Sequence, residues 1–171
     1  MKPLLALIPF LALSALAAPT PQQLQNTTPQ QALKLANLWR TSTTGVRSFV
    51  TSEKIQFTFP DGQVAEVKLP QNQMVIAIAP YLQQTHPCKT HYMSSCTGEM
   101  QNQPVDVLIK DQNSKTIIKR TYRTHANGFL EVWLPRDGTF TVILSAQGKS
   151  ATGMLRTFSG SDTCVTNMQL R

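Results

Sequence analysis

Hydrophobic positions in the first part of the chain follow the period of a helix. Apolar residues recur at helical spacing from Ala32 to Trp39, and Gly45 ends or loosens the region. Thr28 can cap the start of this helix, and Pro29 suits its first position because the N–H group that proline lacks would have no helical partner there. The pattern predicts one helix early in the chain.

The spacing of apolar residues then changes to that of strands. Residues 54–59 alternate between apolar and polar positions, and residues 63–69 do so less regularly. The Pro60-Asp61-Gly62 sequence between the two segments is typical of a hairpin turn. A continuous apolar run at residues 73–80 predicts a third strand. We therefore expect an N-terminal domain, residues 18–80, made of one helix and a small antiparallel sheet.

The second half of the chain is predicted to be almost entirely strand. Short segments rich in β-branched and aromatic residues are separated by turns that contain Gly, Asn, Asp or Pro. These segments are residues 105–110, 116–122, 128–134, 139–145, 150–158 and 164–170. Regular short strands are typical of a β-sandwich. We expect an α+β protein whose C-terminal domain, residues 81–171, is a sandwich-like β domain.

The N-terminus has the pattern of a secretory signal. Met1 and Lys2 give a positive start, residues 4–13 are apolar, and small residues permit cleavage after Ala17. The apolar run is too short to span a bilayer and no comparable run follows, so we expect no transmembrane helix. Residues 1–17 are predicted to be a signal peptide for export.

The formal net charge of +7 changes this picture little. Basic residues are scattered, with one denser stretch at residues 115–123, which is typical of a solvated strand face. A nucleic-acid surface would need interleaved aromatic residues or a known nucleic-acid-binding fold, and the sequence indicates neither. We expect no nucleic-acid partner.

The candidate chemistry lies in three cysteines, Cys88, Cys96 and Cys164. In an oxidising compartment two cysteines usually pair, which leaves one thiol over. The wide spacing of Cys88 and Cys96 differs from the Cys-x-x-Cys of redox enzymes and zinc ribbons. Three thiolates that converge from a loop and the last strand would form an all-sulfur metal site. Soft thiolates select Cu(I), although residue chemistry alone also allows zinc or silver.

Other ligand types accompany the cysteines. His91 is close enough in sequence to Cys88 and Cys96 to join their site, or it faces solvent; both alternatives stay open. His86 is a further candidate ligand, although its position before Pro87 favours a turn residue. The methionines that could add a thioether ligand are Met93, Met100 and Met168.

Two further polar residues have less defined roles. Glu99 either holds a histidine in place for metal binding or is solvated. His125, beside an Asn-Gly turn, is expected in an exposed hairpin. No catalytic residues are predicted, since the sequence offers no Ser-His-Asp set with supporting context.

The run HPCKTHYMSSCTGEM at residues 86–100, followed far downstream by TCVTNMQL at residues 163–170, resembles the CueP family of periplasmic copper-binding proteins. The resemblance covers essentially the whole chain after the signal segment. It implies a periplasmic protein that holds copper on Cys88, Cys96 and Cys164. It also implies a homodimer whose N-terminal dimerisation domain is similar to that of periplasmic disulfide isomerases.

On this resemblance, the expected function is sequestration of copper as Cu(I), which contributes to copper resistance, with transfer to periplasmic copper enzymes as a further hypothesis. Three thiols in an oxidising compartment motivate a separate hypothesis, that a Cys88–Cys96 disulfide forms when metal is absent and that its formation supplies electrons to reduce Cu(II) to Cu(I). We expect no other enzymatic activity. Two alternatives stay open, a periplasmic thiol–disulfide oxidoreductase or isomerase-like protein, and a secreted binding module with an inter-chain disulfide.

Overall fold

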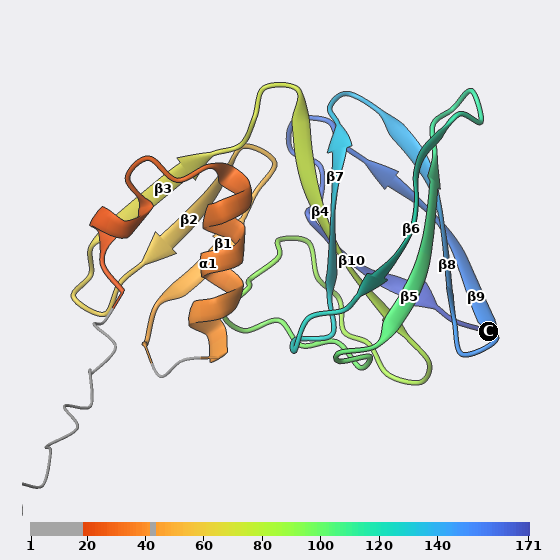
Figure 1. The fold of residues 1–171 in the computed structure, drawn as a ribbon, viewed down its shortest axis with the longest axis horizontal. Helices are drawn as coiled ribbons and strands as arrows, with labels where there is room; N and C mark the ends of the chain where they lie inside the picture. The colour runs from red at the N-terminus through yellow and green to blue at the C-terminus, as the bar shows by residue number, and fades with distance from the viewer. Residues whose placement is uncertain (1–18, 42–43) are drawn as a thin grey trace, which may run out of the picture.

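The computed structural model describes residues 19–41 and 44–171 of the chain. A helix with a small sheet forms one part, and two further sheets form the other (Figure 1). The predicted signal peptide, residues 1–17, lies outside the described residues. Within the described ranges, no helix has the length and apolar character that a membrane crossing requires.

The first part contains a short 3-10 helix, one α-helix and three strands. Their bounds are η1 Pro21–Leu24, α1 Pro29–Thr41, β1 Arg47–Val50, β2 Lys54–Thr58 and β3 Val64–Lys68. The strands form an antiparallel sheet in the order β1-β2-β3. The predicted start of α1 is confirmed, because the Gln31 N–H donates to Thr28 Oγ1 and the Thr28 N–H donates to Gln31 Oε1. The ring of Trp39 packs edge-on against the rings of Phe57, in β2, and Phe59, directly after β2.

The second part contains seven strands in two sheets. Their bounds are β4 Gln73–Tyr81, β5 Pro104–Lys110, β6 Thr116–Arg123, β7 Leu130–Pro135, β8 Thr139–Ala146, β9 Lys149–Arg156 and β10 Cys164–Gln169. One sheet has the order β10-β4-β7 and the other the order β6-β5-β8-β9. Inward side chains of both sheets belong to one hydrophobic cluster. The described residues contain one α-helix and ten strands, which confirms the α+β class.

The position of β4 corrects the sequence analysis. The strand predicted at residues 73–80 does not join the N-terminal sheet; it lies between β7, to which it is antiparallel, and β10, to which it is parallel. The short strand β1, which the pattern did not predict, completes the N-terminal sheet instead. The physical reason is burial, since seven consecutive residues of β4 are buried and need cover on both faces. By its strand partners, β4 therefore belongs with the sheets of the second part.

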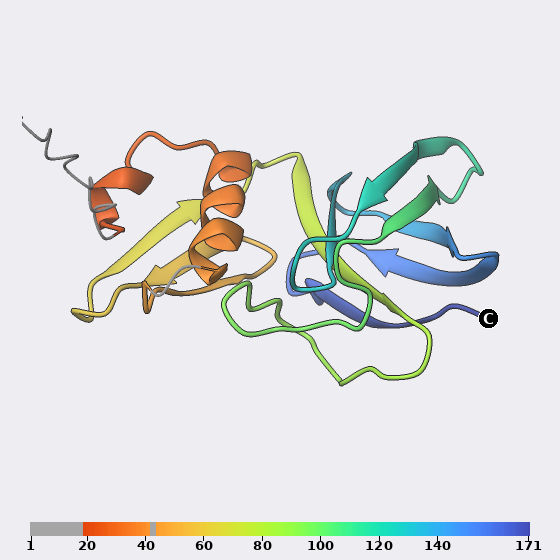
Figure 2. The ribbon, with the colours of Figure 1, turned by 60° about the horizontal axis from the view of Figure 1, so that its bottom comes forward.

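Between β4 and β5 the chain forms a long segment without regular strands, residues 82–103, called the cysteine loop here because it carries Cys88 and Cys96. Figure 2 shows this loop passing beneath α1 and beside the sheet that contains β4. An isolated antiparallel bridge joins His91 of the loop to Val50 of β1. The loop therefore touches both parts of the molecule.

Candidate metal centre

The three cysteines come together at one end of β10. Cys88 and Cys164 form a disulfide, with their Cα atoms 5.5 Å apart, and Cys96 carries a free thiol whose Sγ lies 3.6 Å from Cys88 Sγ. The expected convergence of the cysteine loop with the last strand is therefore present. The hypothesis of a Cys88–Cys96 disulfide is not borne out, because Cys88 is bonded to Cys164.

Backbone bonds explain this pairing. The carbonyl oxygen of Lys89 accepts hydrogen bonds from the N–H groups of both Thr163 and Cys164, at 2.9 and 3.0 Å. They fix the residue after Cys88 against the first residue of β10. The resulting Cα separation is within the range that a disulfide requires.

A tight turn of the cysteine loop positions Cys96. Its N–H donates to the carbonyl oxygen of Tyr92 at 2.8 Å, and the Tyr92 N–H points back to Cys96 Sγ at 3.4 Å. Burial raises the pKa of the half-buried Cys96 thiol, while the Tyr92 N–H and the charge of Arg40 act in the opposite direction. The thiol is thus held in place beside the disulfide.

The site has an apolar floor. Cys88 and Cys96 pack against a small cluster formed by Ala77, Ala79, Phe129 and Cys164, which is separate from the main core. Alanines on β4 leave room for the sulfur atoms where larger side chains would fill it. Sulfur atoms on such a floor are partly shielded from water, which suits soft-metal coordination.

The buried His91 side chain packs against Phe129 of this cluster and lacks hydrogen-bond partners among the described residues. It is fully buried, its ring centroid is 4.4 Å from that of Phe129, and neither ring nitrogen has a partner among the described residues. Its ligand atom and the sulfurs of Cys96 and Cys164 all lie within 4.8 Å of one another. Burial, with smaller effects of Arg40 and His125, lowers the pKa of His91 to about 3, so the imidazole is neutral and can donate a lone pair. Unbonded buried polar atoms are rare and indicate a missing partner.

His86 is the second imidazole at the site. One of its ring nitrogens and the sulfurs of Cys88 and Cys96 also lie within 4.8 Å of one another. Sequence analysis named His86 as a possible ligand but favoured a turn residue, and its position near two sulfurs supports the ligand alternative. Cys96 is shared by the two donor sets, one with each histidine.

The methionines lie in the packed interior. Met93, Met100 and Met168 are buried and belong to the main hydrophobic cluster rather than to the cluster around the cysteines. The sulfur of Met168 fills the space above Gly153. This arrangement favours a packing role for them.

Of the two roles expected for Glu99, the solvated one is confirmed, because the side chain is exposed, and its carboxylate also binds the backbone of the loop. Its Oε2 accepts hydrogen bonds from the backbone N–H groups of Leu82, Gln83 and Gln84, at 2.7, 2.9 and 3.2 Å. These bonds hold the pKa of the Glu99 carboxyl below its usual value. Glu99 thus ties the end of the cysteine loop to its beginning.

His125 is exposed, as expected, but it does not lie in a hairpin, because β6 and β7 belong to different sheets, and its side chain is paired. Its Nε2 lies 3.5 Å from Glu131 Oε2, and this hydrogen bond raises the pKa of His125. Asn37 of α1 donates to the other oxygen of Glu131 at 2.7 Å. The group links α1 to the second part of the molecule.

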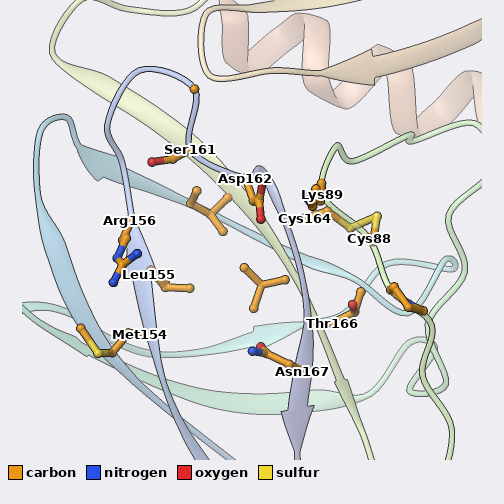
Figure 3. Close-up of a pocket in the computed structure, with 14 residues that line it drawn as sticks. Cys88, Lys89, Met154, Leu155, Arg156, Ser161, Asp162, Cys164, Thr166 and Asn167 are labelled. Atoms are coloured by element: carbon orange, nitrogen blue, oxygen red, sulfur yellow. A yellow bond between two sulfur atoms is a disulfide. The ribbon is translucent and has the colours of Figure 1, made fainter.

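A pocket of about 690 Å³ adjoins the disulfide. Figure 3 shows the Cys88–Cys164 bond at one edge of this pocket, with Lys89 beside it and Met154 and Arg156 on the far side. The disulfide therefore borders an open cavity, which Cys96 does not line.

Three sulfurs and two imidazoles around a shared cysteine, at the rim of a β-rich fold, are the donors expected of a protein that binds a soft transition metal. The chain matches the family model described as Periplasmic copper-binding protein CueP over residues 31–169, and it belongs to this family. It is similar to the crystal structure of S.CueP, with a TM-score of 0.80 and 30% sequence identity, over 88% of this chain and 92% of that chain. No curated protein matches the chain in sequence.

Proposed function

We propose that this protein sequesters copper in the periplasm as Cu(I), on the thiolates of Cys88, Cys96 and Cys164 after the disulfide is reduced. The observation that carries the proposal is the convergence of three sulfurs with the unpartnered imidazole of His91. Thiolates are soft ligands that select Cu(I), and a neutral imidazole suits copper as an additional ligand.

Cu(II) reduction by the same thiols is compatible with this arrangement. Two Cu(II) ions each take one electron, Cys88 and Cys164 lose two electrons and their protons, and the products are two Cu(I) ions and the disulfide. After this step Cys96 still has its thiolate. It belongs to both donor sets, one with His86 and the other with His91. The oxidised protein thus retains a smaller set of ligands for one Cu(I).

Titration of the reduced protein with Cu(I), in competition with a chromogenic Cu(I) chelator, tests the site. Cys88→Ser, Cys96→Ser and Cys164→Ser should each weaken binding by more than the roughly 10–100-fold that loss of an outer-shell partner costs. Met154→Leu is the matched control, because it removes an exposed soft sulfur that lies outside the cysteine cluster. If Cys164→Ser binds Cu(I) as tightly as the wild type, the three-thiolate site is wrong.

Thiol counting tests the reduction step separately. Fully reduced protein mixed with Cu(II) and a Cu(I)-specific dye should lose two thiols for every two Cu(I) ions formed. Unchanged thiols with no Cu(I) would exclude the reaction, without affecting the titration result.

Thiol–disulfide exchange is a second candidate function, favoured by the free thiol of Cys96 beside a disulfide. Copper-free protein would then accelerate the refolding of a substrate protein with scrambled disulfides. No acceleration over a Cys96→Ser control would rule it out.

The partners follow from the same proposal. We propose a homodimer formed by the N-terminal part and hand-over of copper to periplasmic copper enzymes. Strand β3 is at an edge of its sheet, and its Val64 side chain is 55% exposed, which supports an intermolecular contact there. Sedimentation of wild type and Val64→Lys would test the dimer, which should dissociate in the variant.

A further inference from the structure

Arg40, in the last turn of α1, reaches across to the cysteine loop. Its Nη1 donates to the carbonyl oxygen of Met93 at 3.0 Å and its Nη2 donates to Thr97 Oγ1 at 2.8 Å. These two acceptors lie on either side of Cys96 in the sequence. One guanidinium group therefore clamps the turn that carries the free thiol.

The same stretch of the loop is attached to β1. The Val50 N–H donates to the carbonyl oxygen of His91 at 2.9 Å. Thr163 Oγ1 accepts from the His91 N–H at 3.1 Å and donates to the Val50 carbonyl oxygen at 2.6 Å. Farther along, Ser94 Oγ accepts from the Ser48 N–H at 3.3 Å. His91 is thus fixed at the boundary between the two parts.

The candidate ligands are therefore held from two sides. Cys88 and Cys164 are fixed to each other through Lys89 and the start of β10, which belong to the second part. His91 and Cys96 are fixed against β1 and α1 of the first part. A complete donor set requires both parts in their observed positions.

We infer that Arg40 is a positioning residue of the metal centre, which holds Cys96 within reach of the other sulfurs and places a positive charge beside the metal-bound thiolates. The inference rests on the proposed function. A guanidinium group keeps its charge, and its planar arrangement of N–H donors can bind two acceptors at once. It can therefore both hold the turn and supply the positive charge. A Cu(I) ion on three thiolates leaves excess negative charge, which a neighbouring cation stabilises.

A purely structural role is the competing explanation, and Arg136 provides the matched control. Arg136 also joins the two parts, since it donates to the carbonyl oxygens of Pro70 at 3.0 Å and Ser52 at 2.7 Å. These two hydrogen bonds, and the ion pair of Arg136 with Glu53, all lie outside the cysteine loop. Losing Arg136 should weaken the contact between the parts without releasing Cys96.

The experiment compares Arg40→Gln, Arg40→Lys, Thr97→Val and Arg136→Gln in the full chain. Two quantities are measured: Cu(I) affinity of the reduced protein by chelator competition, and the alkylation rate of Cys96 in oxidised, copper-free protein. Arg40→Gln should bind Cu(I) roughly 10–100-fold more weakly, as loss of an outer-shell partner does, and its Cys96 should alkylate faster. Arg40→Lys should recover part of the affinity because it keeps the charge but not the fork, and Thr97→Val should raise the alkylation rate.

Arg136→Gln should leave both quantities within about twofold of the wild type. The inference is overturned if Arg40→Gln changes neither quantity, or if Arg136→Gln changes both as strongly. Thermal unfolding identifies a variant that does not fold, in which case Thr97→Val and Arg40→Lys decide. If wild-type protein binds no Cu(I), the proposed function fails, whereas the alkylation rates still test whether Arg40 positions Cys96.

Discussion

Cys88 Sγ lies 3.6 Å from Cys96 Sγ, although Cys88 is covalently bonded to Cys164. Cys88 is therefore the central sulfur of the cluster, adjacent to one possible partner and bonded to the other. Thiol–disulfide exchange proceeds when a thiolate attacks such a neighbouring disulfide sulfur. The disulfide seen here can thus be replaced by a second pairing without large movement of the chain.

Replacing Cys164 should reveal that second pairing. In oxidised Cys164→Ser, we expect a Cys88–Cys96 disulfide within the chain, because the two sulfurs are already neighbours. Peptide mapping by mass spectrometry under non-reducing conditions identifies the bond. Cys96→Ser is the control and should keep the Cys88–Cys164 bond. Recovery of Cys164→Ser with two free thiols under the same oxidation would contradict the prediction.

The buried His91 side chain should lower the free energy of unfolding of the metal-free protein. Its two buried nitrogens lack partners, and an unsatisfied buried polar group costs about 1–3 kcal/mol. We expect His91→Leu to raise the free energy of unfolding of copper-free protein by about 1 kcal/mol, after some loss from imperfect packing. The same variant should bind Cu(I) more weakly. Denaturant unfolding and chelator competition measure the two effects, and a destabilised variant would contradict the expected gain in stability.

The pH dependence of stability provides a further test of His91. Burial lowers its pKa to about 3 in the folded protein, below its ordinary value of 6.5, so the unfolded chain binds the proton more readily. Above pH 6.5 the imidazole is neutral in both states, and the free energy of unfolding is not reduced. As the pH falls from 6.5 towards 3, the unfolded chain takes up a proton that the folded protein does not, and stability is lost. Copper-free wild type should therefore lose more stability than His91→Leu over this range. Parallel stability curves for the two proteins would contradict the pKa argument.

Local sequence rules predicted the helix and the hairpin correctly because neighbouring residues determine them. The Thr28-Pro29 start and the Pro60-Asp61-Gly62 turn act over a few residues, and both elements are present. The strand at residues 73–80 was found but assigned to the wrong sheet. A continuous apolar run records burial on both faces, yet it does not identify the partner strands, which here are β7 and β10.

The candidate site was predicted by composition rather than by geometry. The residue types identified Cys88, Cys96 and Cys164 as a group, and the structure brings them together. The pairing depends on Lys89 bonding to the start of β10, a contact between residues far apart in the chain. His91 was recognised, but its burial depends on Phe129 and on the contact with β1, which no local pattern encodes.

Glu99 should stabilise the cysteine loop in a pH-dependent way. Its carboxylate accepts three backbone N–H groups, foremost that of Gln83, which lowers its pKa below the ordinary 4.5. Its contribution is present above pH 4.5 and is lost as the pH falls through the lowered folded value. Glu99→Gln should reduce thermal stability at pH 7, with a difference from wild type that disappears at low pH. Glu66→Gln, in an exposed ion pair on β3, is the control and should have a smaller effect.

Gly128 should be required for closing the loop over the site. Its backbone adopts φ +79°, and a Cβ there would lie 2.4 Å from the carbonyl oxygen of Gly98, two residues beyond Cys96. Gly148 has a similar φ of +72°, but a Cβ there would have nothing within 4 Å. Its substitution therefore measures only the cost of placing alanine at a positive φ, without a steric clash. Gly148→Ala should lose about 1 kcal/mol of stability, as expected for a left-handed residue. Gly128→Ala should lose clearly more, and its Cys96 should alkylate faster because the loop must move. Equal destabilisation of the two variants, with unchanged alkylation of Cys96, would show that the close approach of Gly98 and Gly128 does not hold the metal centre in place.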